Sequence, residues 1–166
     1  MNNLIFDRTL EDVKTAIREI QAVQSGQTPS SAFMQGLKGC YNVSDLNRVE
    51  TAVNTVVNLL KTFGINLNLT IKTNWAHGDI FDKTHKQRYL NNISAVRTAW
   101  KVYADTPAAP TNYKYFTYAN DIEKILFDIQ EIYSFYVFNY VLDGRWQLNQ
   151  KPFASYTGTK PIQNGG

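Results

Sequence analysis

Residues 118–142 read YANDIEKILFDIQEIYSFYVFNYVL, the longest run of helical periodicity in the chain. On a helical projection, the aliphatic and tyrosine side chains of this run form one broad stripe. Phe127, Phe135 and Phe138 fall on the opposite side. A helix that is apolar on both sides has two explanations: it is buried all round within one bundle, or it packs the core with one face and a second subunit with the other. We expect the second arrangement, with these three phenylalanines at the interface.

Apolar side chains also recur at helical spacing in four earlier segments. The first follows Thr9, which suits an N-cap, and the second runs through residues 33–37. The third runs from about residue 44 to 63 and the fourth from about 84 to 102. These patterns predict a mainly α fold, a bundle of four to five helices that occupies residues 1–142 as one domain.

Three of the predicted helix starts resemble one another when Arg48, Arg88 and Lys124 are placed in register. The predicted N-caps, four residues earlier in each case, are Ser44, Thr84 and Asn120. Two explanations stay open: a small unit has been duplicated, or capped amphipathic helices align this well by their general character.

One segment has the periodicity of a strand instead. Residues 65–73 read INLNLTIKT, in which apolar and polar residues alternate strictly. We therefore predict a minor β-strand or hairpin element here. Because a strand cannot satisfy its ladder alone, it needs a partner, and residues 145–148 (RWQL) are the best local candidate.

Composition excludes several classes of protein. The chain has 166 residues, of which 43% are hydrophobic and 19% charged, so it is not of disordered type. A formal net charge of +3 is too small to indicate nucleic-acid binding, and no apolar run has the length of a membrane span. The N-terminus lacks signal-peptide features, and one cysteine, Cys40, cannot form an internal disulfide.

The richest group of chemically capable side chains lies between residues 77 and 85. His77, Asp79, Asp82 and His85 could surround a divalent metal ion, but their spacing matches no ligand signature. A turn that leads into a helix needs residues of this kind in any case. We therefore favour turn chemistry and expect no metal, no cofactor and no catalytic residue.

Residues 143–166 are predicted to be an extended C-terminal tail, rich in polar residues, glycine and proline. Trp146, Phe153 and Tyr156 are spaced along it, and spaced aromatic residues on such a segment can anchor in the grooves of a partner. We count them as candidate interface residues, with a frayed end as the alternative.

Several short blocks together resemble a group of small proteins encoded in the structural gene clusters of tailed phages and prophages of Gram-positive bacteria. The blocks cover most of residues 3–132 and read LIFDRT (4–9), GLKGCYN (36–42), DLNRVE (45–50), NWA (74–76), GDI (78–80), RYLNN (88–92) and YANDIE (118–123). The resemblance implies a virion component of the tail tip or baseplate, without enzyme activity.

We therefore expect a non-enzymatic virion protein that assembles in multiple copies, as a homo-oligomer, or links the tail to receptor-binding fibres. Its partners would be other tail or baseplate proteins, and it would be assembled in the cytoplasm of the bacterial host. Two alternatives stay open: a module that binds host cell-wall carbohydrate, and a metal-dependent enzyme that uses residues 77–85.

Overall fold

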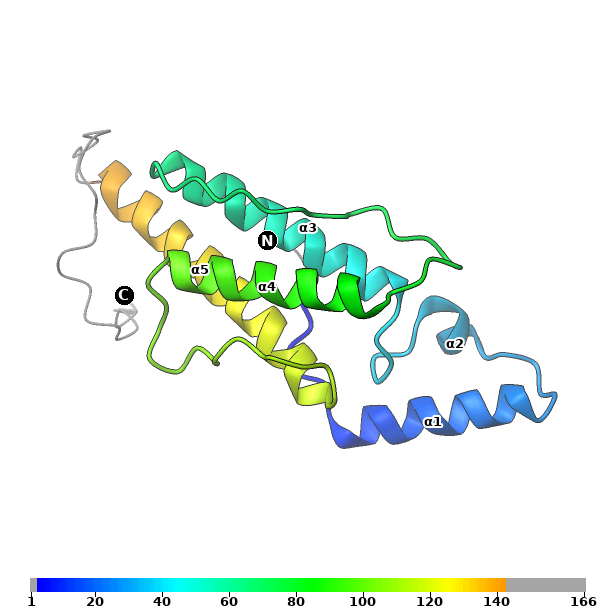
Figure 1. Ribbon diagram of the computed structural model, residues 1–166. Helices are drawn as coiled ribbons and strands as arrows, with labels where there is room; N and C mark the ends of the chain where they lie inside the picture. Colours follow the sequence, from blue (N-terminus) through cyan, green and yellow to red (C-terminus); the bar gives the residue numbers. More distant parts are fainter. Residues whose placement is uncertain (1–2, 143–166) are drawn as a thin grey trace, which may run out of the picture.

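Three long helices form the centre of the molecule. The computed structural model describes residues 3–142, and within them each of α3 (Val43–Thr62), α4 (Lys83–Ala99) and α5 (Phe116–Leu142) packs against the other two (Figure 1). The core consists of aliphatic residues from these helices together with four aromatic residues, Trp75, Tyr89, Trp100 and Tyr103. Its most deeply buried large side chains are Leu60, Tyr89, Ile93, Ile122, Ile125, Leu126, Ile129 and Ile132. The prediction of a mainly helical fold is confirmed.

The remaining helices stand to one side. α1 (Leu10–Gln24) and α2 (Ser31–Gln35) have few contacts with the three central helices, and α1 runs away from them (Figure 1). Ala16 is the one buried residue of α1, and α2 has none. The bundle therefore contains three helices instead of the four to five that we predicted, and residues 10–35 form an arm beside it.

Side-chain caps begin four of the helices, and that of α2 is Ser30, which accepts from the backbone N–H of Phe33. Thr9 caps α1 and forms a capping box with Asp12, as its spacing predicts. α3 is capped by Asn42 and α4 by Asp82, so the predicted caps Ser44 and Thr84 are wrong by two residues. The third predicted cap, Asn120, is also wrong, because α5 begins at Phe116. Asn42, Ser44, Asp82 and Thr84 are all good N-cap residues, and helical periodicity does not choose between neighbours of equal quality.

The predicted β element is not present, because the structure contains no strand within residues 3–142. Residues 65–71 are nevertheless extended, with apolar side chains half-buried against the core and the polar ones between them exposed. The alternation is therefore real as a burial pattern. Residues 145–148, the proposed partner strand, lie outside the described residues.

Helix side chains bind the backbone of this extended segment. The carbonyl oxygen of Thr70 accepts from Arg88, at 2.7 Å, and from Asn92, at 2.8 Å. Asn47 accepts from the backbone N–H of Trp75, at 2.7 Å, and donates to its carbonyl oxygen, at 2.9 Å. An amide that donates and accepts in this way makes the pair of bonds that a neighbouring strand would make.

The N-terminal segment is held in the same manner. Asn120 on α5 accepts from the backbone N–H of Arg8, at 3.1 Å, and donates to its carbonyl oxygen, at 2.9 Å. The molecule thus docks two extended segments on a helical core by side-chain amides, which replaces a sheet ladder with contacts that sequence periodicity does not report.

Candidate interaction surfaces

The three phenylalanines of α5 predicted at an interface lie in different environments. Phe127 is half-buried and its ring packs on that of Phe6, with centroids 5.0 Å apart. Phe135 is also half-buried, whereas Phe138 is 64% exposed. Of the three, Phe138 alone offers most of its side chain to a partner. Trp146, Phe153 and Tyr156 lie outside the described residues.

The predicted group at residues 77–85 forms a turn and a helix cap. Asp79 is paired with Lys72, at 2.6 Å, and accepts from the backbone N–H of Ala76, at 3.1 Å. Asp82 accepts from the backbone N–H of His85, at 2.8 Å, and Asp82 Oδ1 lies 2.9 Å from Nδ1 of the same histidine. These hydrogen bonds lower the pKa of both aspartates, Lys72 contributing most for Asp79 and the backbone of His85 for Asp82. Both carboxylates are engaged in local structure.

The fourth member of this group, His77, is exposed, while His85 packs edge-on against Trp75 with centroids 5.2 Å apart. Within the part of the chain that the structure describes, no three His, Cys, Asp or Glu side chains gather in a way that would hold a metal ion. The residues of the metal hypothesis therefore do not form one cluster there.

A buried network of charges lies where the N-terminal segment meets α3 and α5. Arg8 contacts Asp45, at 3.0 Å, and Glu123, at 2.8 Å, and the side chains of all three are at least 94% buried. Arg48 binds Glu123 with two nitrogens, at 2.9 and 3.0 Å, and also pairs with Asp45. Burial opposes the charge of Arg48, but the bonds to Glu123 and Asp45 outweigh it, so that its pKa is raised. This network holds three segments together, and within the described residues Arg8 Nε is its one buried side-chain nitrogen without a hydrogen-bond partner.

Sequence spacing does not predict this network. Arg8 and Glu123 are 115 positions apart, and spacing cannot show that they meet. The clue that was available is a shared pattern, Asn-x-Val/Ile-Glu, at residues 47–50 and 120–123.

The arm exposes apolar side chains. Leu10 and Ile17 of α1 are 57% and 48% exposed, and Met34 of α2 is 73% exposed. A concave region of about 400 Å³ lies at the base of the arm, between the first turns of α1, the loop at residues 39–41 and residues 113–119. Leu10 and the 63% exposed Tyr115 are among the residues that line it. Such a surface suits contact with another protein more than with water.

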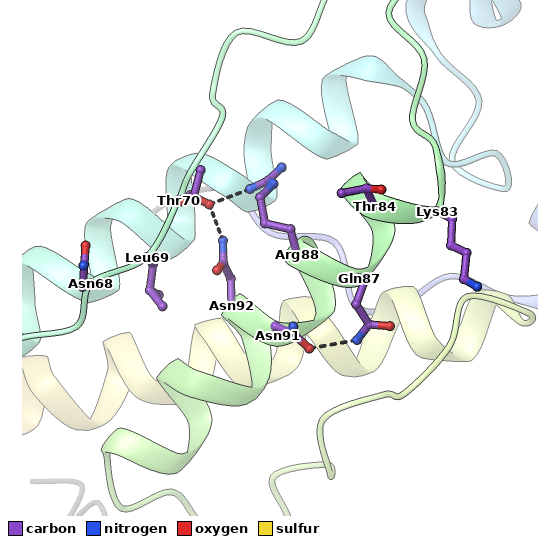
Figure 2. A pocket seen from close by; sticks show the side chains of 9 residues that line it. All are labelled: Asn68, Leu69, Thr70, Lys83, Thr84, Gln87, Arg88, Asn91 and Asn92. Carbon is purple, nitrogen blue, oxygen red and sulfur yellow. Dashed lines mark hydrogen bonds between the residues drawn. The ribbon is translucent and has the colours of Figure 1, made fainter.

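A second, more polar groove lies beside the extended segment (Figure 2). It measures about 580 Å³ and is open to solvent. Its lining comes from two elements, namely residues 68–70 of the extended segment and the first half of α4. The α4 residues are Lys83, Thr84, Gln87, Arg88, Asn91 and Asn92.

Two features bear on the carbohydrate alternative. Trp75 and Trp100 are each 4% exposed, so neither ring is available as a platform for a sugar, and Trp146 lies outside the described residues. The groove of Figure 2 is lined mainly by amide, hydroxyl and basic side chains and by no aromatic one. Neither tryptophan nor this groove therefore offers an aromatic platform. Of the surface tyrosines on which that alternative also depends, Tyr115 is 63% exposed and lies beside Tyr118, with ring centroids 5.6 Å apart.

None of the helices within residues 3–142 combines the length and the apolar character that crossing a bilayer requires. No known protein-family model matches the chain, and neither the curated proteins nor the solved structures contain a significant match.

Proposed function

We propose that this chain is a non-enzymatic structural protein, a tail-tip or baseplate component of a phage virion that assembles in several copies or joins the tail to its fibres. One observation carries the proposal: α1 stands outside a rigid three-helix core and exposes Leu10 and Ile17. Exposure of an apolar helix face to water is unfavourable, and its burial against another protein lowers the free energy. The resemblance of residues 3–132 to tail-region proteins supports the virion setting.

The rigid core is also suited to assembly. Buried ion pairs fix the helices, and the side-chain amides of Asn47 and Asn120, here called the amide clasps, fix both extended segments. Little conformational freedom is therefore lost when a partner binds. Apolar side chains are exposed at separate places, among them the arm, Ile80 and Phe138 in the last turns of α5, which would let one copy contact more than one neighbour. This arrangement suits a component that bridges parts of a larger particle.

Assembly is tested by solution mass, measured by light scattering at two protein concentrations. We expect the mass to rise with concentration, and the variant Ile17→Ser to lower it at equal concentration. The control Lys14→Ser changes an exposed polar residue of the same helix and should leave the mass unchanged. A species that is monomeric at both concentrations, for the natural chain and for Ile17→Ser alike, contradicts self-assembly through the arm.

The virion setting has its own test. Particles purified from a host that carries the gene with an epitope tag should contain the tagged protein, and gold-labelled antibody should mark the distal end of the tail. Label confined to capsids, or tagged protein found only outside particles, would contradict this setting.

A further inference from the structure

The extended segment has the shape of a strand without the hydrogen bonds of one. Thr70 and Lys72 bond through their backbones to side chains of α3 and α4. The backbone groups of residues 66–69 make no hydrogen bond to the described part of the chain. Their apolar side chains are nevertheless packed on the core, so this backbone is held in place. A fixed, extended backbone with unpaired N–H and C=O groups is a template on which another strand can pair.

The groove of Figure 2 gives such a strand a place to lie. It is bounded on one side by residues 68–70 and on the other by the exposed side chains of α4 from Lys83 to Asn91. Eight residues of helix span about 12 Å, which is the length of roughly four residues of extended chain. The groove thus fits a short strand segment along its length.

The side chains of α4 have the chemistry that an extended backbone requires. Gln87 and Asn91 are exposed and bond to each other at 2.9 Å, so both amides can exchange that contact for a ligand. Asn92 is 5% exposed, and its amide nitrogen already holds the carbonyl oxygen of Thr70, at 2.8 Å. The same molecule binds extended backbone by helix amides at Asn47 and at Asn120. Amides serve this purpose because each one both donates and accepts.

The charges of the groove favour an acidic ligand. Lys83 and Arg88 line it, and no carboxylate is among its lining residues. Arg88 is neutralised by the buried Glu50, whereas Lys83 is exposed and makes no ion pair with the described residues. A carboxylate at one end of a bound segment would therefore find a cation and no carboxylate among the lining residues.

We propose that the groove between residues 68–70 and α4 binds an acidic, extended segment of a partner protein, which pairs as an added strand with residues 66–69. The partner supplies backbone hydrogen bonds to that segment and to the amides of Gln87 and Asn91, and a carboxylate to Lys83. This inference rests on the proposed function, since it assigns the surface by which an assembly component holds a neighbour.

The test uses the full chain, labelled with ¹⁵N, and the synthetic peptide acetyl-Asp-Thr-Val-Thr-Val-Glu-amide as probe. We expect saturable chemical-shift changes confined to residues 66–71 and 83–92. A peptide with N-methyl groups on alternate residues should bind at least tenfold more weakly, because it cannot complete the ladder. A Lys-for-acid version of the peptide should also bind more weakly, and increasingly so at low salt.

A matched pair of variants checks the charge. Lys83→Glu should weaken binding of the acidic peptide by about fivefold and more at low salt, as expected for loss and reversal of one surface charge contact. Lys86→Glu changes the same charge on the same helix at an exposed residue outside the groove lining and should leave the affinity within about twofold. Equal effects of the two variants would overturn the assignment to this groove.

Other outcomes overturn the proposal as well. Absence of shift changes at millimolar peptide, or changes elsewhere in the chain, would do so directly. Amides of residues 66–69 protected from hydrogen exchange in the free monomer would indicate residues 143–166 as the occupant, and protection that grows with protein concentration would indicate a second copy. Failure here leaves the assembly test intact, because that test changes Ile17 on the arm and reads the mass of the free protein.

Discussion

Glu50 on α3 and Glu123 on α5 occupy equivalent positions in the structure. Each is at least 99% buried, each accepts two nitrogens of one arginine, and each also accepts a backbone N–H from an extended segment. The arginine is Arg88 for Glu50 and Arg48 for Glu123. Asn47 and Asn120, three positions before these glutamates, hold the same two extended segments by their backbones. α3 and α5 therefore share one arrangement, in which an asparagine and a buried glutamate three positions later hold an extended segment by its backbone.

This arrangement predicts how the removal of Glu123 changes the free energy of unfolding. The change Glu123→Ala leaves Arg8 and Arg48 buried beside Asp45 alone, one negative charge for two positive ones. We expect the free energy of unfolding to fall by about 3–5 kcal/mol, the range for breaking a buried pair by deleting one partner. Urea denaturation followed by circular dichroism measures it. Glu19→Ala, on the arm, is the control and should change the value by less than about 0.5 kcal/mol.

The amide clasps predict a second, smaller effect. Asn47→Ala removes both bonds to Trp75 and leaves the N–H and the carbonyl oxygen of that residue without partners. We expect a loss of about 1–3 kcal/mol in the free energy of unfolding, and Asn120→Ala should behave alike at Arg8. Asn54→Ala, at an exposed position of the same helix, is the control. Equal losses for Asn47→Ala and Asn54→Ala would show that the clasp contributes nothing.

A cluster of three tyrosines, of which Tyr89 is buried and Tyr41 and Tyr113 are half-buried, predicts how stability depends on pH. The hydroxyls of Tyr41 and Tyr89 hydrogen-bond to each other, and the ring of Tyr113 packs on both. Burial raises the pKa of all three phenols well above the ordinary value. The unfolded chain releases these protons near pH 10, while the folded chain keeps them. Stability is therefore fully present below about pH 10 and falls above it, by about 1.4 kcal/mol per pH unit for each tyrosine.

The measurement is a series of urea denaturation curves between pH 8 and pH 11. The triple variant with Phe at positions 41, 89 and 113 should have a flatter pH profile over that range, whatever its absolute stability. Tyr115→Phe, which changes a 63% exposed residue, should keep the steep profile. A natural chain whose stability is level up to pH 11 would contradict the assignment.

Local periodicity predicted the parts of the fold that depend on burial alone. The five helices, the cap at Thr9 and the inward and outward alternation of residues 65–71 all follow from which side chains avoid water. The same alternation could not show what bonds the backbone. Here Arg88, Asn92 and Glu50 do this from helices, so an extended segment that looks like a strand has no ladder.

Residue spacing could not predict the contacts between segments that are distant in the sequence. The projection of α5 put Phe127 on a second apolar side, but that Phe6 covers it depends on where the N-terminal segment runs. The predicted register of Arg48 with Lys124 also differs from the structure, in which residues 47–50 correspond to residues 120–123 by their contacts. An alignment by the Asn-x-Val/Ile-Glu pattern would have found the correspondence, because those two residue types make the contacts.

The attachment of the arm depends on a glycine, and this predicts a local effect. A Cβ added at Gly39 would lie 2.1 Å from the carbonyl oxygen of Asp12, a backbone atom of α1. Gly39→Ala must therefore push the helix away from the loop that supports it. Because α1 has few contacts with α3, α4 and α5, the loss should stay in the arm. We expect hydrogen-exchange protection of residues 10–24 to fall by about tenfold, and that of the central helices to change by less than about twofold.

A change at the adjacent residue, Lys38, distinguishes the effect of added bulk at Gly39 from the effect of lost ion pairs. Lys38→Ala removes the ion pairs to Asp7, at 3.0 Å, and Asp12, at 3.7 Å, without adding bulk. These pairs are partly exposed and contribute about 0–1 kcal/mol, so protection of α1 should fall less than in Gly39→Ala. If Gly39→Ala lowered protection equally in α1 and in the core, the arm would be part of one cooperative unit. The lower solution mass of Ile17→Ser would then reflect the stability of the whole molecule as well as the loss of an exposed apolar contact on α1.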